Sequence, residues 1–449
     1  MMDTRVRTGT AHVLILALTI AAGVAVSADL AQNQISAMQL AQARQMLRTV
    51  REAVRERYYD PTFGGRDVVA HFKTAEQKLD AAESVGRAYA VIAQALVDFG
   101  DSHTYFLPPE IPATFEYGWQ MAIVGDRCLV LGVKPGSDAE AKGLRAGDHI
   151  LQVETLPPTR ADLWKMRYSL NLLNPRRRVR LMVQTPGGAP RPLEIETKVT
   201  PRPREVRINM ESVMNGITSD FDEMSARRVN RVARVGGVAI WRLEAFDFPP
   251  DQVDREFDPV VKGATDLIID LRGNPGGLVK TLEQLTGKLF DRDVKLGDMK
   301  GRKSTKPSMA KKRKNPFLGR VVVLVDSESG SAAEILARVL QLEQRAIVMG
   351  DRTAGSVMVG EMMMSAVQLM SASDELSILP YGFSVTVADI IMKDGQSLER
   401  VGVVPDDVLV PTQEDLAAGR DPVLARAATS LGATLDPVAA GKLFPLLWR

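Results

Sequence analysis

The sequence predicts an α/β fold that is preceded by a helical region and contains an inserted β-rich unit. From residue 238 onward, short apolar runs typical of buried strands alternate with amphipathic helical segments. Residues 33–59 and 84–99 have the apolar spacing of helices, whereas residues 117–200 combine strand-like runs with glycine turns. With 449 residues, the chain is long enough for two or three domains.

The composition argues against several classes of function. A formal net charge of +2 gives no reason to expect a nucleic-acid partner, and we expect the basic segment 300–320 to be a solvated loop. The single cysteine, Cys128, excludes an intramolecular disulfide framework and a cysteine-built zinc site. We expect neither a metal nor a cofactor. The oligomeric state stays open.

The amino-terminal residues have the pattern of an export signal. Arg5 and Arg7 form a short basic region, an apolar run covers residues 11–28, and Asp29 follows the small residues that signal peptidases prefer. We therefore expect a periplasmic or secreted protein without residues 1–28. The alternative is an uncleaved membrane anchor formed by residues 11–28, which is the only route by which we expect membrane contact.

The helical region contains a candidate for a catalytic base. The helix predicted over residues 84–99 ends at Gly100, and a loop with Ser102 and His103 follows directly. A serine nucleophile needs a base, which is usually histidine. Of the four histidines, His12 belongs to the export signal, His71 lies in a predicted helix and His149 in a predicted strand. By elimination, His103 is the best candidate for a base.

A second candidate group lies in the α/β region. Ser331 stands between a strand predicted over 321–325 and a helix, where the unpaired amides of the first helical turn suit an oxyanion. Local pattern alone favours helix capping over catalysis for this serine. The glycine-rich residues 273–277 follow another buried strand, predicted over 267–271. They fit a strand-to-helix turn and a ligand contact equally well.

Together these motifs resemble the tail-specific, or C-terminal processing, serine peptidases, and more closely their branch with the tricorn-protease core. The resemblance covers nearly all of the chain after the export signal. It rests on the following motifs: Gly118-Trp119-Gln120-Met121, Val133-Lys134-Pro135-Gly136-Ser137, Gly143 to Asp148, Asp270 to Gly277, Ser329 to Ile335, and Gly402 to Asp406.

The resemblance implies a crotonase-like α/β catalytic core with an N-terminal helical region and an inserted PDZ-like β-rich domain. The corresponding boundaries are 29–115 for the helical region, 116–200 for the PDZ-like domain and 201–449 for the core. Peptide or protein substrates are implied. The residues implied for the site are Ser331 as nucleophile, His103 as base, Gly276, Gly277 and Ala332 as oxyanion hole, and Gly118, Trp119, Gln120 and Met121 for peptide binding.

One departure from the family pattern bears on the mechanism. The processing peptidases proper use a lysine as base, and Ser356 stands where that lysine is expected. The tricorn-like branch uses a Ser-His pair and a glutamate, which Ser102, His103 and Glu399 match. Glu334 and Asp406 remain competitors for the acidic role. A catalytically inactive peptide-binding scaffold and an esterase-like hydrolase remain alternative functions.

Overall fold

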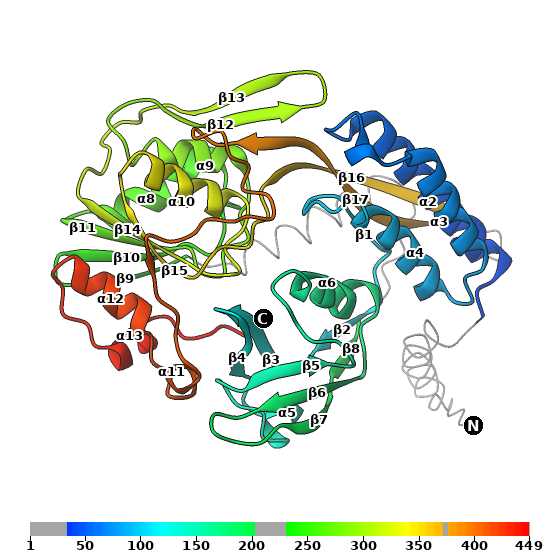
Figure 1. The fold of residues 1–449 in the computed structure, drawn as a ribbon, viewed down its shortest axis with the longest axis horizontal. Coiled ribbons are helices and arrows are strands. Elements are labelled where there is room, and N and C mark those ends of the chain that lie inside the picture. Colours follow the sequence, from blue (N-terminus) through cyan, green and yellow to red (C-terminus); the bar gives the residue numbers. More distant parts are fainter. Residues whose placement is uncertain (1–33, 203–229, 371–375, 449) are drawn as a thin grey trace, which may run out of the picture.

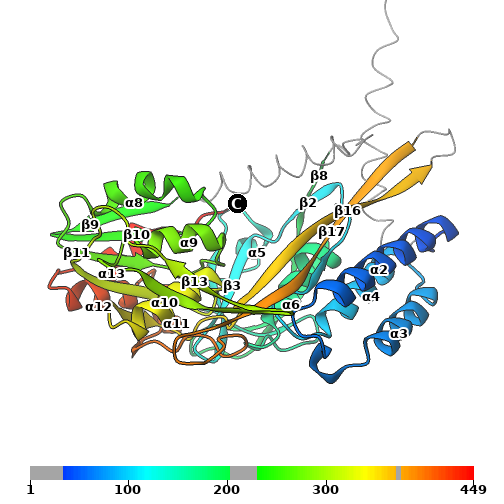
Figure 2. The same cartoon turned by 90° about the horizontal axis from the view of Figure 1, so that it is seen from above.

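The computed structural model describes residues 34–202, 230–370 and 376–448, and the expected export signal lies outside them. The predicted α/β fold is confirmed, because helices pack on mainly parallel strands in the largest region of the molecule (Figures 1 and 2). Among the described residues, no helix is both long and apolar enough to cross a membrane.

The amino-terminal region is helical, as expected. Its helices are α2 (Ala37–Arg57), α3 (Val68–Asp80) and α4 (Val85–Val97). Each begins at a side chain that accepts hydrogen bonds from first-turn amides, namely Ser36, Asp67 and Ser84. The short strand β1 (Tyr105–Leu107) follows α4 and pairs with β17 (Leu376–Ile391), which comes from the carboxyl-terminal half of the chain. The helices and β17 share one apolar core.

The middle of the chain forms a small β unit. Its five-stranded sheet has the order β3-β4-β5-β6-β7, and a separate pair, β2-β8, lies at its base. The elements are β2 (Ala113–Glu116), β3 (Trp119–Val124), β4 (Arg127–Val133), α5 (Asp138–Ala141), β5 (His149–Val153), α6 (Leu163–Tyr168), β6 (Arg178–Gln184), β7 (Arg191–Glu196) and β8 (Lys198–Pro201). The motif of residues 118–121 resembles the carboxylate-binding loop of a PDZ domain, but Trp119 to Met121 form the start of β3.

The large α/β unit is built on a six-stranded sheet with the order β18-β15-β14-β11-β10-β9. Only β9 runs antiparallel to its neighbour. The strands are β9 (Arg231–Val235), β10 (Val238–Arg242), β11 (Asp266–Asp270), β14 (Arg320–Val325), β15 (Ile347–Gly350) and β18 (Asp407–Val408). β9 is formed by the residues just before β10 and pairs with that strand.

Helices cover both faces of this sheet (Figure 1). One face carries α8 (Val253–Val261), α9 (Val279–Thr286) and α10 (Ala332–Leu342), and the other carries α12 (Pro422–Ser430) and α13 (Pro437–Leu443). A short helix, α11 (Gln413–Ala417), precedes them. The βα turns after β11 and β14 therefore open at the carboxyl edge of the same sheet, where ligands bind in such folds.

A second sheet joins the α/β unit to the helical region. It contains β12 (Val294–Gly301), β13 (Thr305–Ala310), β16 (Met358–Met370) and β17, with β17 lying between β16 on one side and β1 and β12 on the other. The prediction of a solvated loop for residues 300–320 is wrong, since much of this segment forms the β12–β13 hairpin. The local sequence, which is polar, does not predict that β12 pairs with the distant β17.

Candidate active site

Ser331 occupies the turn between β14 and α10 with an unusual backbone conformation. Its φ is +52° and its ψ is −116°. Side-chain-bearing residues seldom adopt positive φ, and such strain is typically retained at functional sites. The strain must be balanced by contacts that hold this residue in place.

The buried carboxylate of Glu334 supplies those contacts. Its Oε2 accepts hydrogen bonds from the amides of Ser331 at 3.0 Å and Ser356 at 2.8 Å. Its Oε1 accepts bonds from the Thr353 hydroxyl at 2.5 Å and the Gly355 amide at 2.7 Å. Burial raises the pKa of Glu334, and the four donors oppose this rise. The carboxylate therefore ties the serine to the segment 353–356.

Residues 273–277 lie directly against Ser331. A Cβ on Gly276, which has a φ of +102°, would stand 2.6 Å from the Ser331 Cβ, so only glycine fits. The buried Asn274 connects the two turns, because its carbonyl accepts the Gly330 amide at 2.8 Å. Its side-chain oxygen accepts the Gly276 amide at 2.8 Å. That amide is therefore already engaged.

Two amides in these turns have no such partner. Within the described parts of the chain, no hydrogen bond is formed by the amide of Ala332, the first residue of α10, or by that of Gly277. An unpaired amide at the start of a helix can donate a hydrogen bond to a bound anion. Of the three residues expected for an oxyanion hole, Ala332 and Gly277 thus keep a free donor, and Gly276 does not.

His103 and Glu399 are connected through Ser102. The Ser102 hydroxyl lies 2.8 Å from His103 Nδ1 and 2.8 Å from Glu399 Oε2. The Ser102 amide also donates to Glu399 Oε1 at 2.8 Å, and the Val357 amide donates to Oε2 at 2.8 Å. The structure therefore brings Glu399 to the adjacent pair Ser102-His103, although 297 positions separate it from Ser102 in the sequence.

Burial changes the protonation equilibria of this group. It raises the pKa of Glu399 to about 7, although the hydrogen bonds from Ser102 and Val357 oppose the rise. Burial also lowers the pKa of His103, with the charge of Asp101 acting in the opposite direction. Asp101 itself accepts the His103 amide at 3.0 Å and the Tyr58 hydroxyl at 3.0 Å. Burial thus favours the neutral form of the histidine.

The serine and the histidine flank the same stretch of chain, residues 353–360. The Ser356 carbonyl accepts the Ser331 amide at 3.0 Å, and the next residue, Val357, bonds to Glu399. A Cβ on Gly360 would stand 3.2 Å from the His103 Cβ. No hydrogen bond joins His103 to Ser331 within the described residues. Catalytic hydrogen bonds often tighten only when substrate is bound.

The two competing carboxylates lie elsewhere. Glu334 bonds to the serine side of the segment 353–360, as described above. Asp406 accepts the Val348 amide and the Gln341 side chain, at 2.8 and 3.0 Å. Of the three acids that the sequence left open, only Glu399 contacts Ser102.

A small apolar cavity of about 20 Å³ opens beside Ser331. Its walls are Val279, Leu282, Leu296, Ser308, Ala332, Ile335, Met358, Val359 and Ile390. Most of these side chains are aliphatic, and they come from α9, α10 and the second sheet. Their arrangement suits a small apolar group next to the serine hydroxyl.

The residues expected to bind a peptide lie on the small β unit, at the junction with the serine loop. The carbonyl of Met121 accepts a hydrogen bond from Arg167 of α6, which also pairs with Glu328. The carbonyl of Ile123 accepts the Ser327 hydroxyl at 2.5 Å. The edge of β3 is therefore joined to the loop that leads to Ser331. Nothing in the sequence pattern had indicated Arg167.

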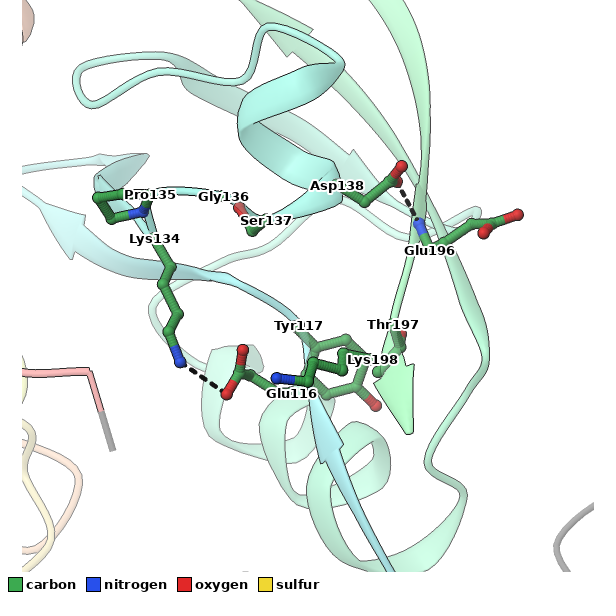
Figure 3. Close-up of a pocket in the computed structure, with 10 residues that line it drawn as sticks. All are labelled: Glu116, Tyr117, Lys134, Pro135, Gly136, Ser137, Asp138, Glu196, Thr197 and Lys198. Carbon is green, nitrogen blue, oxygen red and sulfur yellow. Dashed lines mark hydrogen bonds and ion pairs between the residues drawn. The ribbon is translucent and has the colours of Figure 1, made fainter. Parts of the chain in front are cut away.

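A larger cavity, of about 310 Å³, lies on the same unit, between α5 and the β2–β8 pair (Figure 3). An ion pair of 2.7 Å between Lys134 and Glu116 and a hydrogen bond of 2.6 Å from the Glu196 amide to Asp138 cross its walls. None of its lining residues belongs to the Ser331 or His103 cluster. Among the described residues, no group of three or more potential metal ligands occurs.

Comparison with known proteins relates part of the chain to a peptidase family and most of it to processing proteases. Residues 237–409 match the model of peptidase family S41. The carboxyl-terminal-processing protease of Picosynechococcus is 23% identical over 336 residues, which cover 72% of this chain and 73% of that protein. The chloroplastic carboxyl-terminal-processing peptidase 1 of Arabidopsis thaliana is 26% identical over 350 residues, which cover 74% of this chain and 65% of that protein.

Solved structures show the same fold. Mature CPAF superposes with a TM-score of 0.61 at 17% identity, covering 85% of this chain and 95% of CPAF. The photosystem II D1 C-terminal processing protease superposes with a TM-score of 0.51 at 22% identity, covering 91% of this chain and all of that protein. The solved structures show the fold alone, whereas the match of residues 237–409 to peptidase family S41 and the related processing proteases support a serine peptidase.

Proposed function

We propose that this chain is an exported serine endopeptidase of the tricorn-like type, in which Ser331 attacks the peptide carbonyl and His103 accepts its proton. The observation that carries the proposal is the hydrogen-bond chain from Glu399 through Ser102 to His103 Nδ1, with both steps at 2.8 Å. The expected export belongs to the proposal as well. It rests on residues 1–28, and a mature chain beginning at Asp29 would support it.

The hydrogen-bond chain selects one tautomer of the histidine. The Ser102 hydroxyl carries a single proton, and an ionised carboxylate can only accept hydrogen bonds. When Ser102 donates to Glu399, its oxygen must accept the proton on His103 Nδ1. The Nε2 lone pair is then free to remove the Ser331 proton, as general-base catalysis requires. Ser102 and Glu399 act as positioning residues.

Protonation of Glu399 would reverse this chain. A neutral carboxylic acid can donate to Ser102, which then donates to His103 Nδ1 and leaves the proton on Nε2. That tautomer cannot accept a proton from Ser331. Because the pKa of Glu399 is raised to about 7, we expect the rate to fall as the pH drops through neutrality.

Acyl transfer completes the proposed mechanism. Ser331 Oγ bonds to the carbonyl carbon, and the negative oxygen receives hydrogen bonds from the free amides of Ala332 and Gly277. His103 then delivers its proton to the leaving amine, and water repeats the sequence to release the acyl group. The cavity beside Ser331 favours a small apolar residue before the scissile bond.

The test is covalent labelling of the serine. Ser331→Ala should abolish peptidase activity and labelling by a fluorophosphonate probe, while the melting temperature stays close to that of the wild type. Ser356→Ala is the matched control, since it alters a neighbouring serine and should label normally. Full labelling of Ser331→Ala would show that the nucleophile is another residue.

We further propose that residues 116–200 form a PDZ-like domain that binds an extended peptide at β3, with Gly118, Trp119, Gln120 and Met121 next to its carboxylate. A peptide on this edge would replace the bonds that Arg167 and Ser327 make to β3 carbonyls. Gly118→Pro should raise KM for long peptides and leave kcat largely unchanged. An equal loss of kcat on long and short peptides would refute the binding role.

A further inference from the structure

Strand β16 has one unpaired edge. It pairs with β17 along its whole length, from Met358↔Asp389 to Met370↔Leu376. On its other side, no strand of the described chain pairs with it, and no described residue outside β17 bonds to the backbone of residues 360–366. In an antiparallel pair, alternate residues point their amides and carbonyls away from the partner. Such an edge is a template for another strand.

The unpaired edge begins inside the candidate active site. Just before the strand, the Ser356 carbonyl bonds to the Ser331 amide, and Met358 and Val359 line the cavity beside that serine. Gly360 lies against the imidazole, since a Cβ there would stand 3.2 Å from the His103 Cβ. A chain paired with this edge would lead directly to the serine and the histidine.

Two exposed side chains along the edge are apolar and adaptable, and the exposed Glu361 between them and Gly360 forms an ion pair of 2.5 Å with Arg57 of α2. Met362 and Met364 are 38% and 36% exposed, and they project from the same face of β16. On the opposite face, Met363 and Val367 pack into the core of the helical region. Methionine is flexible and polarisable, and it is common on surfaces that accept varied apolar partners. Proteins usually avoid exposed apolar residues on a free edge, so their presence here indicates a binding function.

Gly360 permits a close approach at the point where this edge meets the histidine. It is exposed, and any side chain there would collide with the Ser384 hydroxyl at 2.7 Å. Glycine within a strand commonly marks a place where another backbone comes close. The edge of β3 differs, because two of its carbonyls already accept bonds from Arg167 and Ser327.

We propose that the free edge of β16, from Gly360 to Met364, binds the extended polypeptide substrate by strand addition, as a subsite continuous with the cavity beside Ser331. The proposal rests on the function proposed above. Backbone pairing is independent of sequence, and Met362 and Met364 add apolar contact without a strict shape requirement. The subsite would therefore accept extended apolar stretches of many sequences, whereas the cavity next to the serine selects the residue at the cleaved bond.

The experiment uses the full chain and a set of peptides that share one cleavage site. A single N-methyl group is moved residue by residue along the peptide, away from the scissile bond on either side, because it removes one backbone donor without changing a side chain. We expect KM to rise about tenfold at every second position on one side of the bond, and little in between. A uniform effect at all positions, or none, would overturn strand addition.

Two variants locate the subsite on β16. Met362→Glu combined with Met364→Glu should raise KM for the unmethylated long peptide and leave a short substrate unaffected. Leu318→Glu is the matched control, since Leu318 is 62% exposed and lies at the opposite end of β14 from Ser331. If the double variant matches the control, the edge of β16 is not the subsite. Normal fluorophosphonate labelling of all three proteins separates that failure from failure of the proposed nucleophile.

Discussion

The two sides of the candidate active site are held by contacts of very different range. On the serine side, Glu334 bonds to residues between 3 and 22 positions away in the sequence. On the histidine side, Ser102 bonds to Glu399 across 297 positions, and Thr104 bonds to Thr386 across 282. The serine is thus positioned by contacts within the α/β unit, whereas the histidine is positioned by the docking of the helical region.

Because of this difference, the α/β unit can fold before its active site is complete. The serine turn forms when β14 and α10 pack, because its partners lie in the same unit. The histidine reaches its place only when the helices and β17 form their shared core. Loss of activity without loss of the α/β fold is therefore the expected consequence of any change that loosens the helical region.

The largest effect is expected when His103, on the side of the site held by long-range contacts, is removed. His103→Ala should lower kcat by roughly 10²–10⁴-fold, because the general base is lost while Ser331 and its turn stay in place. His149→Gln, on the remote strand β5, serves as control. Groups that act as one unit are not additive, so combining His103→Ala with Ser331→Ala should add almost nothing. Wild-type rates in His103→Ala would contradict the proposed mechanism.

The short-range side is tested at Glu334. In Glu334→Gln, an amide nitrogen must face at least one of the four donors that now meet an oxygen, which leaves a buried donor unsatisfied. We expect kcat to fall about 10- to 100-fold and the melting temperature to drop as well, since the same bonds hold the fold. Glu343→Gln, at the other end of α10, removes ion pairs with Arg292 and Lys393 but should leave kcat unchanged, so it serves as the control for position. An unchanged kcat would show that Glu334 does not position the serine.

The smallest effect at neutral pH is expected for Glu399, and its signature is a shift in the pH profile. In the wild type, ionised Glu399 is required, so the rate falls as the pH drops through about 7. Glu399→Gln cannot titrate. Its acid limb should move to lower pH, where His103 becomes protonated, because burial lowers the pKa of that imidazole. The plateau should be lower than in the wild type.

Ser102→Ala provides the second arm of this measurement. It interrupts the hydrogen-bond chain but leaves Glu399 and His103 in place, so it too should lose the limb near neutrality. If both variants keep the wild-type profile, the titration seen in the rate belongs to another group.

The sequence predicted the short-range side better than the long-range side. The βα turns at residues 273–277 and at Ser331 follow from local pattern, since buried strand, glycine turn and amphipathic helix are adjacent in the chain. His103 was found only by elimination, and Glu399 only through the family resemblance. No local signal connects Ser102 with a residue 297 positions away. Asp101 and Arg167 were missed for the same reason.

The errors in the fold have a similar origin. Residues 300–320 are polar and were expected to be a loop, but much of this segment pairs as the β12–β13 hairpin, and β12 also pairs with β17. Trp119 to Met121 were assigned to a loop by the motif, although their alternating burial is that of a strand. The domain boundaries and the roles of the individual site residues remain predictions.

The hairpin of β12 and β13 also reaches the helical region. Arg302, between its two strands, bonds to the Tyr58 carbonyl at 2.9 Å and lies over the Phe63 ring. Tyr58 in turn bonds to Asp101, which holds the backbone of His103. A displacement of about 1 Å in a catalytic group can cost about 100-fold in rate. A change at Arg302 would therefore reach the histidine through Tyr58 and Asp101, which makes the tip of a distant hairpin part of the support of the site.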